Sequence, residues 1–157
     1  MKTTLLVVGR TVDKNIIPAI EDYTGRIKHF AQFEIEVIPE LKNARKLSEQ
    51  QQKEAEGELI LKAINPGDLV VLLDEGGKEF RSTEFASWIE HKQHLSAKRL
   101  VFIVGGPYGF SRKVYDCANE KISLSRMTFS HQMIRLLFVE QLYRAHTIIN
   151  NLPYHHE

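Results

Sequence analysis

The sequence predicts an α/β protein with a mostly parallel sheet and helices on both faces. Short β-branched or continuously apolar runs alternate with longer segments whose apolar residues recur at helical spacing. Two runs, LVVLLD (69–74) and RLVFIV (99–104), have the continuous hydrophobicity of strands that are buried on both faces. With 157 residues, no linker and no internal repeat, the chain is expected to form a single domain over 1–157.

The first elements are expected to be strand, helix and strand. Residues 3–9 (TTLLVVG) form a short apolar run that ends in glycine, as a strand does. Residues 14–31 carry apolar side chains at helical spacing. Residues 33–38 (FEIEVI) then alternate between apolar and charged side chains and stop at Pro39, which indicates a second strand.

A polar helix is expected next, before the first of the two buried strands. Residues 44–64 are helix-forming and become apolar at their end, and NPGD (65–68) is a turn. After the buried strand, Ser82 or Thr83 is a candidate N-cap for a helix that continues to about Leu95.

The second buried strand runs directly into GGPYG (105–109). Ser111 is then expected to cap a short helix at 114–118. KISLS (121–125) is a weaker alternating strand, and the last helix is expected from about Ser130 to Asn150.

Composition narrows the class of protein. The chain has 21 basic and 20 acidic residues, so nonspecific charge alone does not explain nucleic-acid binding. Residues 1–97 carry 13 basic and 16 acidic groups, whereas residues 98–157 carry 8 and 4, which makes the C-terminal third the favoured face for an anion. The apolar run near the start is too short for a signal peptide or a membrane span, and a single cysteine favours a reducing compartment, so a soluble cytoplasmic protein is expected.

Three loops follow the expected strands at one edge of the sheet, where ligands of parallel sheets bind. They comprise residues 74–77, 105–109 and 125–130. Adjacent glycines in GGPYG permit close approach of the backbone to a ligand, although a tight turn explains them equally well. Asp74 and Glu75 are adjacent in a strand and so point to opposite faces, which favours a strand end over a metal site. The histidines and the lone cysteine show no zinc-binding spacing, and no metal is expected.

The last helix is apolar nearly all round, with only a narrow polar wedge at Glu140, Arg144 and Thr147. Such a helix must be covered on more than one face, either by a second subunit or by burial within the chain. His131 and Arg135 fall beside its apolar stripe and are expected to be partly desolvated. Glu140 and Arg144 have the spacing of a helix ion pair.

Five segments together resemble the bacterial 23S rRNA pseudouridine N3-methyltransferases, the small single-domain branch of the SPOUT methyltransferases. They are LLVVGRTVD near the start, VVLLDEGGKEF (70–80), FIVGGPYGFS (102–111), SLSRMTFSHQMIRLLFVEQLYRAHTI (123–148) and PYHH (153–156). The resemblance covers essentially the whole chain. It implies a SPOUT-type α/β fold with a C-terminal trefoil knot, a rare exception to the rules of chain connection.

The resemblance also implies a homodimer that binds S-adenosylmethionine (SAM) in the knot loops. Its substrate would be a pseudouridine in helix 69 of 23S rRNA within the assembled 70S ribosome, with no role for DNA, a membrane or a metal. Carried over by motif, the cofactor contacts would be Leu73, Gly105, Ser125, Arg126, Met127, Thr128, Phe129 and Ser130.

Two positions depart from the family pattern. Gly76 replaces an arginine that is frequent after the Asp-Glu pair, which removes any anion contact there. Ser130 replaces a proline that commonly precedes the histidine of the last motif, a change that a backbone contact to SAM survives.

Methylation of a uracil-type N3 requires that the N3 proton be lost, through a base or through a cation that stabilises the N3 anion. The candidate groups are His131, Arg135, Arg144, Tyr154 and His155, among which Arg144 and the Tyr154–His155 tail are favoured as substrate-side groups. Whether His131 or His155 is the base stays open. The alternatives are a SPOUT methyltransferase for another rRNA or tRNA base and a ribosome-associated factor without catalysis.

Overall fold

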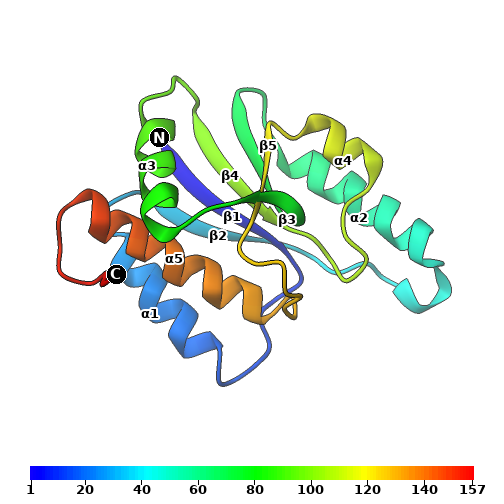
Figure 1. Ribbon diagram of the computed structural model, residues 1–157. Coiled ribbons are helices and arrows are strands. Elements are labelled where there is room, and N and C mark those ends of the chain that lie inside the picture. Colours follow the sequence, from blue (N-terminus) through cyan, green and yellow to red (C-terminus); the bar gives the residue numbers. More distant parts are fainter.

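In the computed structural model, which describes residues 1–157, five strands form one wholly parallel sheet in the order β2-β1-β4-β3-β5 (Figure 1). The strands are β1 (Lys2–Val8), β2 (Phe33–Ile38), β3 (Asp68–Glu79), β4 (Arg99–Val104) and β5 (Glu120–Ser123). The predicted α/β class is therefore confirmed. Because all strands run the same way, their carboxyl ends share one edge of the sheet.

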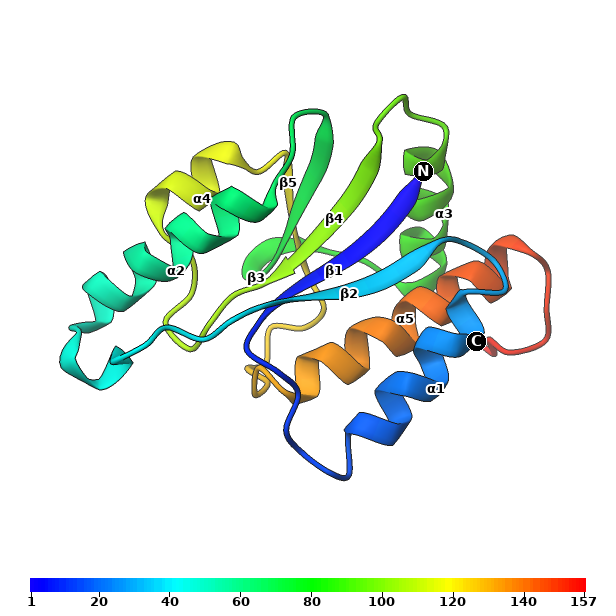
Figure 2. The same ribbon diagram turned by 180° about the vertical axis from the view of Figure 1, so that it is seen from behind.

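Helices cover both faces of the sheet, as expected (Figures 1 and 2). One face carries α1 (Ile17–Ile27), α3 (Ser82–Gln93) and α5 (Met133–Ile149). The other carries α2 (Glu49–Ala63) and α4 (Arg112–Cys117), and a short 3₁₀ helix, Ala44–Lys46, precedes α2. None of the helices is both long and apolar enough to cross a membrane.

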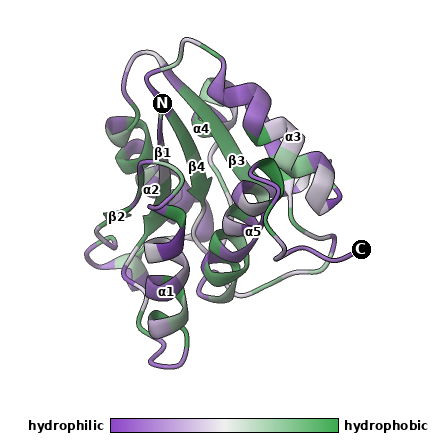
Figure 3. Cartoon of the chain, turned by 90° about the vertical axis from the view of Figure 1, so that its left-hand side faces the viewer, coloured by the Kyte–Doolittle hydropathy of each residue, from purple (hydrophilic) through white to green (hydrophobic).

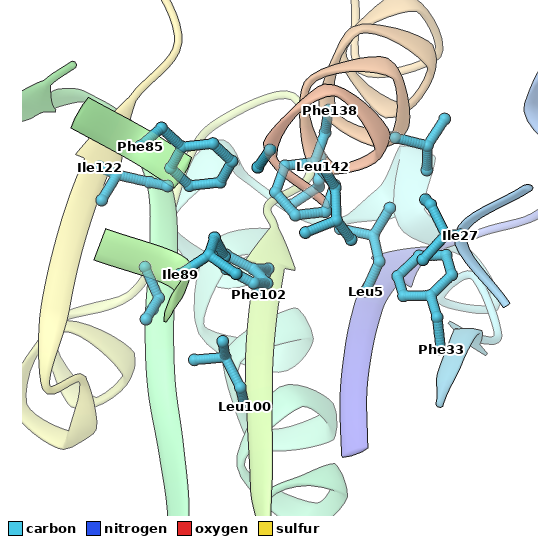
Figure 4. Packing of buried hydrophobic residues seen from close by; sticks show 14 of the residues in the cluster. Leu5, Ile27, Phe33, Phe85, Ile89, Leu100, Phe102, Ile122, Phe138 and Leu142 are labelled. Atoms are coloured by element: carbon cyan, nitrogen blue, oxygen red, sulfur yellow. The ribbon is translucent and has the colours of Figure 1, made fainter. Parts of the chain in front are cut away.

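The larger core lies between the sheet and α1, α3 and α5. Phe102 of β4 is fully buried at the centre of this core. Its ring centroid lies 4.7 Å from that of Phe138 in α5 and 6.4 Å from that of Phe85 in α3 (Figure 4). Aromatic pairs at this spacing add to the stabilisation from burial alone. Figure 3 shows the resulting layering, with hydrophobic strands inside and hydrophilic outer surfaces on α1 and α3.

On the opposite face, α2 packs tightly against the segment after β4. A Cβ at Gly57 would lie 3.0 Å from the Cβ of Ser111 and would overlap its hydroxyl group. Ser111 in turn accepts a hydrogen bond from the backbone N–H of Val114, which confirms it as the N-cap of α4. This contact with helix α2 therefore fixes the position of the segment that follows β4.

The structure differs from the expected elements mainly at β3, which does not end at Asp74 but continues to Glu79. Its second part pairs Lys78 with Ile122 after a shift of register. A Cβ at Gly77 would lie 2.6 Å from the backbone N and C of Ile122, so only glycine allows this approach. The next helix has Arg81 as its N-cap, and neither Ser82 nor Thr83 caps it.

Candidate functional site

The three loops predicted to meet at the carboxyl edge of the sheet enclose one cleft of about 510 Å³. It lies beyond the ends of β3, β4 and β5 and reaches the start of α5. The residues that line it are Leu73, Asp74, Glu75, Val104, Gly105, Gly106, Pro107, Gly109, Phe110, Ser123, Leu124, Ser125, Met127, Thr128, Phe129, Ser130, His131 and Ile134. This volume is in the range of sites for cofactors and other small molecules.

The cleft wall that follows β4 consists of backbone atoms, because Gly105 and Gly106 have no side chains. A Cβ at Gly105 would lie 3.1 Å from the ring of Phe110, which also lines the cleft. A Cβ at Gly106 would lie 2.6 Å from Oε2 of Glu56, whose side chain is buried beneath the turn. Ligand and backbone can therefore approach closely here, with helix α2 supporting the turn from behind.

Short hydrogen bonds shape the loop between β5 and α5. The hydroxyl of Ser123 donates to the carbonyl of Ser125 (2.8 Å), and the hydroxyl of Ser125 accepts from the N–H of Met127 (2.9 Å). The hydroxyl of Thr128 donates to Glu75 at the end of β3 (2.9 Å), and that of Ser130 accepts from the N–H of Met133 (3.1 Å). The loop is thus joined both to β3 and to the first turn of α5.

All but one of the expected cofactor contacts line this cleft. The exception is Arg126, whose exposed side chain turns to Glu79 (Nε–Oε1 2.7 Å). Any contact from Arg126 to a ligand in the cleft would have to come from its backbone. The remaining contacts were expected from the resemblance to the family, motif by motif, and the position of three loops after the expected strands pointed to the same edge of the sheet.

Arg135 is only 2 % exposed and serves the fold rather than a substrate. Its guanidinium donates to the carbonyls of Val8 (2.8 Å), Gly9 (2.9 Å) and His131 (3.0 Å). Burial lowers its pKa. The expected desolvation of Arg135 is confirmed. Arg135 leaves the set of candidate substrate-side groups, because these carbonyls at the end of β1 and before α5 occupy its guanidinium.

His131 lies at the rim of the cleft with an exposed side chain. His131 is more exposed than its place beside the apolar stripe predicts, and helix α5 begins only at Met133, after it. Its imidazole is thus accessible to a molecule in the cleft, whereas its backbone carbonyl is held by Arg135.

The C-terminal tail and α5 bring a second group of polar side chains together. Arg144 donates to Nδ1 of His155 (3.1 Å) and to Glu140 (2.5 Å), and its guanidinium lies 4.7 Å from the ring centre of Tyr154. The hydroxyl of Tyr154 donates to Glu140 (3.0 Å) and lies 3.1 Å from the hydroxyl of Tyr23 in α1. Burial, and then these two neighbours, raises the pKa of Tyr154, which therefore stays protonated at neutral pH.

The sequence predicted Arg144, Tyr154 and His155 as one functional group, and the structure brings them into contact. The ion pair of Glu140 with Arg144 within the helix was expected from the sequence. The second hydrogen bond of Glu140, which it accepts from Tyr154, was not. Tyr23 gave no signal, because only the packing of α1 on α5 brings it near the tail.

Within one chain, this C-terminal cluster is separate from the cleft. Ile134 lines the cleft and Arg144 lies ten residues further along α5, which corresponds to about 15 Å along the helix axis. Figure 1 shows α5 running from the loops of the cleft towards the C-terminus.

The fold and the cleft define an α/β protein with a cleft of small-molecule size beyond the carboxyl ends of its strands. Comparison with known families gives the class more closely: the family model described as "Predicted SPOUT methyltransferase" matches residues 1–155. The chain belongs to the SPOUT methyltransferase family and is a methyltransferase.

Close relatives match over the full length of both chains. Proteins named ribosomal RNA large subunit methyltransferase H are 74% identical in Phocaeicola vulgatus, 69% in Bacteroides fragilis and 54% in Porphyromonas gingivalis, each with 100% of both chains covered. Among solved structures, a probable methyltransferase from Bordetella pertussis is similar in fold, with a TM-score of 0.56 at 12% identity over 92% of this chain and 94% of that one.

Proposed function

We propose that this protein is a SAM-dependent rRNA methyltransferase that methylates N3 of a pseudouridine in helix 69 of 23S rRNA, on the assembled 70S ribosome and as a homodimer. The observation that carries the proposal is the cleft of about 510 Å³ formed by the three predicted loops, in a chain whose full-length relatives are named for methylation of large-subunit rRNA. Such a substrate implies a cytoplasmic location.

The residues of the cleft fit SAM. Leu73, Phe110 and Phe129 offer apolar surfaces for an adenosine, and the glycine turn offers backbone groups. The proposed cofactor contacts are those expected from the sequence, with Arg126 acting through its backbone. Bound SAM supplies an electrophilic methyl group on a positively charged sulfur, and the transfer needs no metal.

The remaining chemistry is removal of the N3 proton, for which His131 is the better placed base. Its side chain is exposed at the rim of the cleft. His155, by contrast, accepts at Nδ1 from Arg144, which can only donate, so the lone pair that a base needs is already used. Tyr154 stays protonated and Arg144 is a fixed cation; both suit stabilisation of the N3 anion rather than proton removal.

Because the C-terminal cluster lies about 15 Å from the cleft along α5, we propose that each cleft is completed by the tail of a second copy. Exposed apolar side chains near the cleft support such a contact: Met127 is 74% and Val12 72% exposed, and Met133 also carries open apolar surface. Gln132 holds the loop of Val12 beside the start of α5, since its Oε1 accepts from the N–H of Val12 (2.8 Å). A twofold arrangement would create two identical composite sites. The C-terminal trefoil knot stays a prediction.

The test is methylation of purified ribosomes together with nucleoside analysis of a deletion strain. We expect transfer of label from SAM to 70S particles, and loss of 3-methylpseudouridine when the gene is deleted. Methylation of a different rRNA or tRNA base would favour the first alternative. SAM binding and ribosome binding without any transfer would favour the factor without catalysis.

A further inference from the structure

The charge of the cleft is one-sided. Two carboxylates, Asp74 and Glu75, line it, whereas no lysine or arginine side chain does, and His131 is the only other titratable group in its wall. The hydroxyl of Thr128 holds Glu75 from the opposite loop (2.9 Å). The next residue, Gly76, has no side chain that could neutralise the pair.

No ion pair joins Asp74 or Glu75 to a lysine or arginine, and three cations of neighbouring segments are turned to other groups, Lys121 among them, over the ring of Tyr115. Arg126 pairs with Glu79 (2.7 Å), which does not line the cleft. The ammonium of Lys78 lies 4.9 Å from the ring centre of Phe80. The two carboxylates are therefore left without a cationic partner among the residues around the cleft, and a positively charged ligand would lower their electrostatic energy.

Methyl transfer changes the charge of the cofactor. The bond between sulfur and the methyl carbon breaks, its electron pair stays on sulfur, and the methyl carbon bonds to N3 of the substrate, whose proton goes to a base. A sulfonium with a charge of +1 thereby becomes a neutral thioether, S-adenosylhomocysteine (SAH). A cleft of net negative charge distinguishes these two molecules, although they differ by a single methyl group.

We propose that Asp74 and Glu75 are specificity-determining residues that make the cleft favour the sulfonium cofactor over its neutral thioether product. This inference rests on the proposed function, because it takes SAM as the occupant of the cleft. Its consequence is that methyl transfer lowers the affinity of the protein for the cofactor. The negative charge of the site therefore favours release of the product SAH.

Calorimetry on the full-length protein tests this with three ligands: SAM, SAH and sinefungin, in which an amine replaces the sulfonium and keeps the positive charge. Asp74→Asn and Glu75→Gln are each expected to weaken SAM and sinefungin roughly tenfold while SAH changes by less than about threefold. Glu90→Gln is the matched control, because Glu90 is exposed on α3 and does not line the cleft, and should change none of the three affinities.

A second measurement uses the wild-type protein and therefore does not depend on whether a variant folds. Raising salt should reduce the preference for SAM over SAH, because screening weakens the attraction to a partly exposed carboxylate. Equal losses for SAM and SAH in the variants, together with a preference that salt does not alter, would overturn this inference alone. Failure of the wild-type protein to bind any of the three ligands would instead overturn the proposed function.

Discussion

Replacing Gly106 with alanine would place a methyl group against the carboxyl group of Glu56. The added Cβ would lie 2.6 Å from Oε2 and 2.8 Å from Cδ, and closer still to Oε1, well inside ordinary van der Waals contact. Glu56 has little room to retreat, because its side chain is only 5% exposed and the adjacent Gly57 already packs against Ser111. The Gly106 turn would have to move instead, and with it one wall of the cleft.

Overpacking of this kind costs about 1–3 kcal/mol of unfolding free energy. Urea unfolding of Gly106→Ala measures that loss, and calorimetry measures the accompanying loss of SAM affinity. Glu56→Ala removes the atoms that the new methyl group meets. The free-energy loss from Gly106→Ala should therefore be smaller in the Glu56→Ala background by about 1 kcal/mol or more.

Gly25→Ala, in helix α1, is a matched control, because no heavy atom of another element lies within 4 Å of the added Cβ. That variant should be stabilised by up to about 1 kcal/mol, since alanine is the better helix former. If Gly106→Ala were as stable as the wild type, or lost equal stability with and without Glu56, the close contact between helix α2 and the turn would be refuted.

Four further outcomes follow from the same structure. Burial lowers the pKa of His146 to about 4. As the pH falls, this histidine is therefore protonated in the unfolded chain before it is protonated in the folded one, so the free energy of unfolding is at its full value above about pH 6.5 and falls by about 3 kcal/mol as the pH drops to 4. Urea unfolding across this range should show a shallower pH dependence in His146→Leu, and an unchanged slope would contradict the assignment. Arg135→Met should cost about 1–3 kcal/mol by leaving buried carbonyls unpaired, and a melting curve equal to that of the wild type would show that these hydrogen bonds contribute nothing. Removing residues 153–157 should leave SAM affinity within about twofold but reduce methyl transfer at least about 100-fold, because the donor of Tyr154 to the N3 anion is lost; full activity of the shortened protein would exclude the tail from the site. Met133→Asp should turn a homodimer into a monomer in sedimentation analysis, and a persistent dimer would place the interface elsewhere.

The strands with strong local patterns were predicted most closely. Residues 33–38 and 99–104 form β2 and β4 with the expected bounds, because Pro39 ends one and the glycine turn ends the other. The continuation of β3 through Gly77 was not predictable from local pattern. A polar, glycine-containing segment is typical of a loop, and only the close approach to Ile122 of β5 makes it a strand.

In the candidate site, too, some features could be predicted from the sequence and others could not. The loops after buried strands could be expected to meet, because parallel strands end at one edge of the sheet. The desolvation of Arg135 was expected from its place beside the apolar stripe, but its partners, the carbonyls of Val8 and Gly9, lie more than a hundred residues away and no spacing in the sequence reveals them. The sequence could likewise suggest a role for Arg144 but not its separation from the cleft, which follows from the direction of α5.

The most direct test of the account is a crystal structure of the protein with SAM. We expect electron density for the cofactor in the cleft, against the backbone of Leu73, Gly105 and the segment 125–130. Density at another place, such as the smaller cavity of about 250 Å³ beside Phe80 and Leu137, or an empty cleft at saturating SAM, would contradict it.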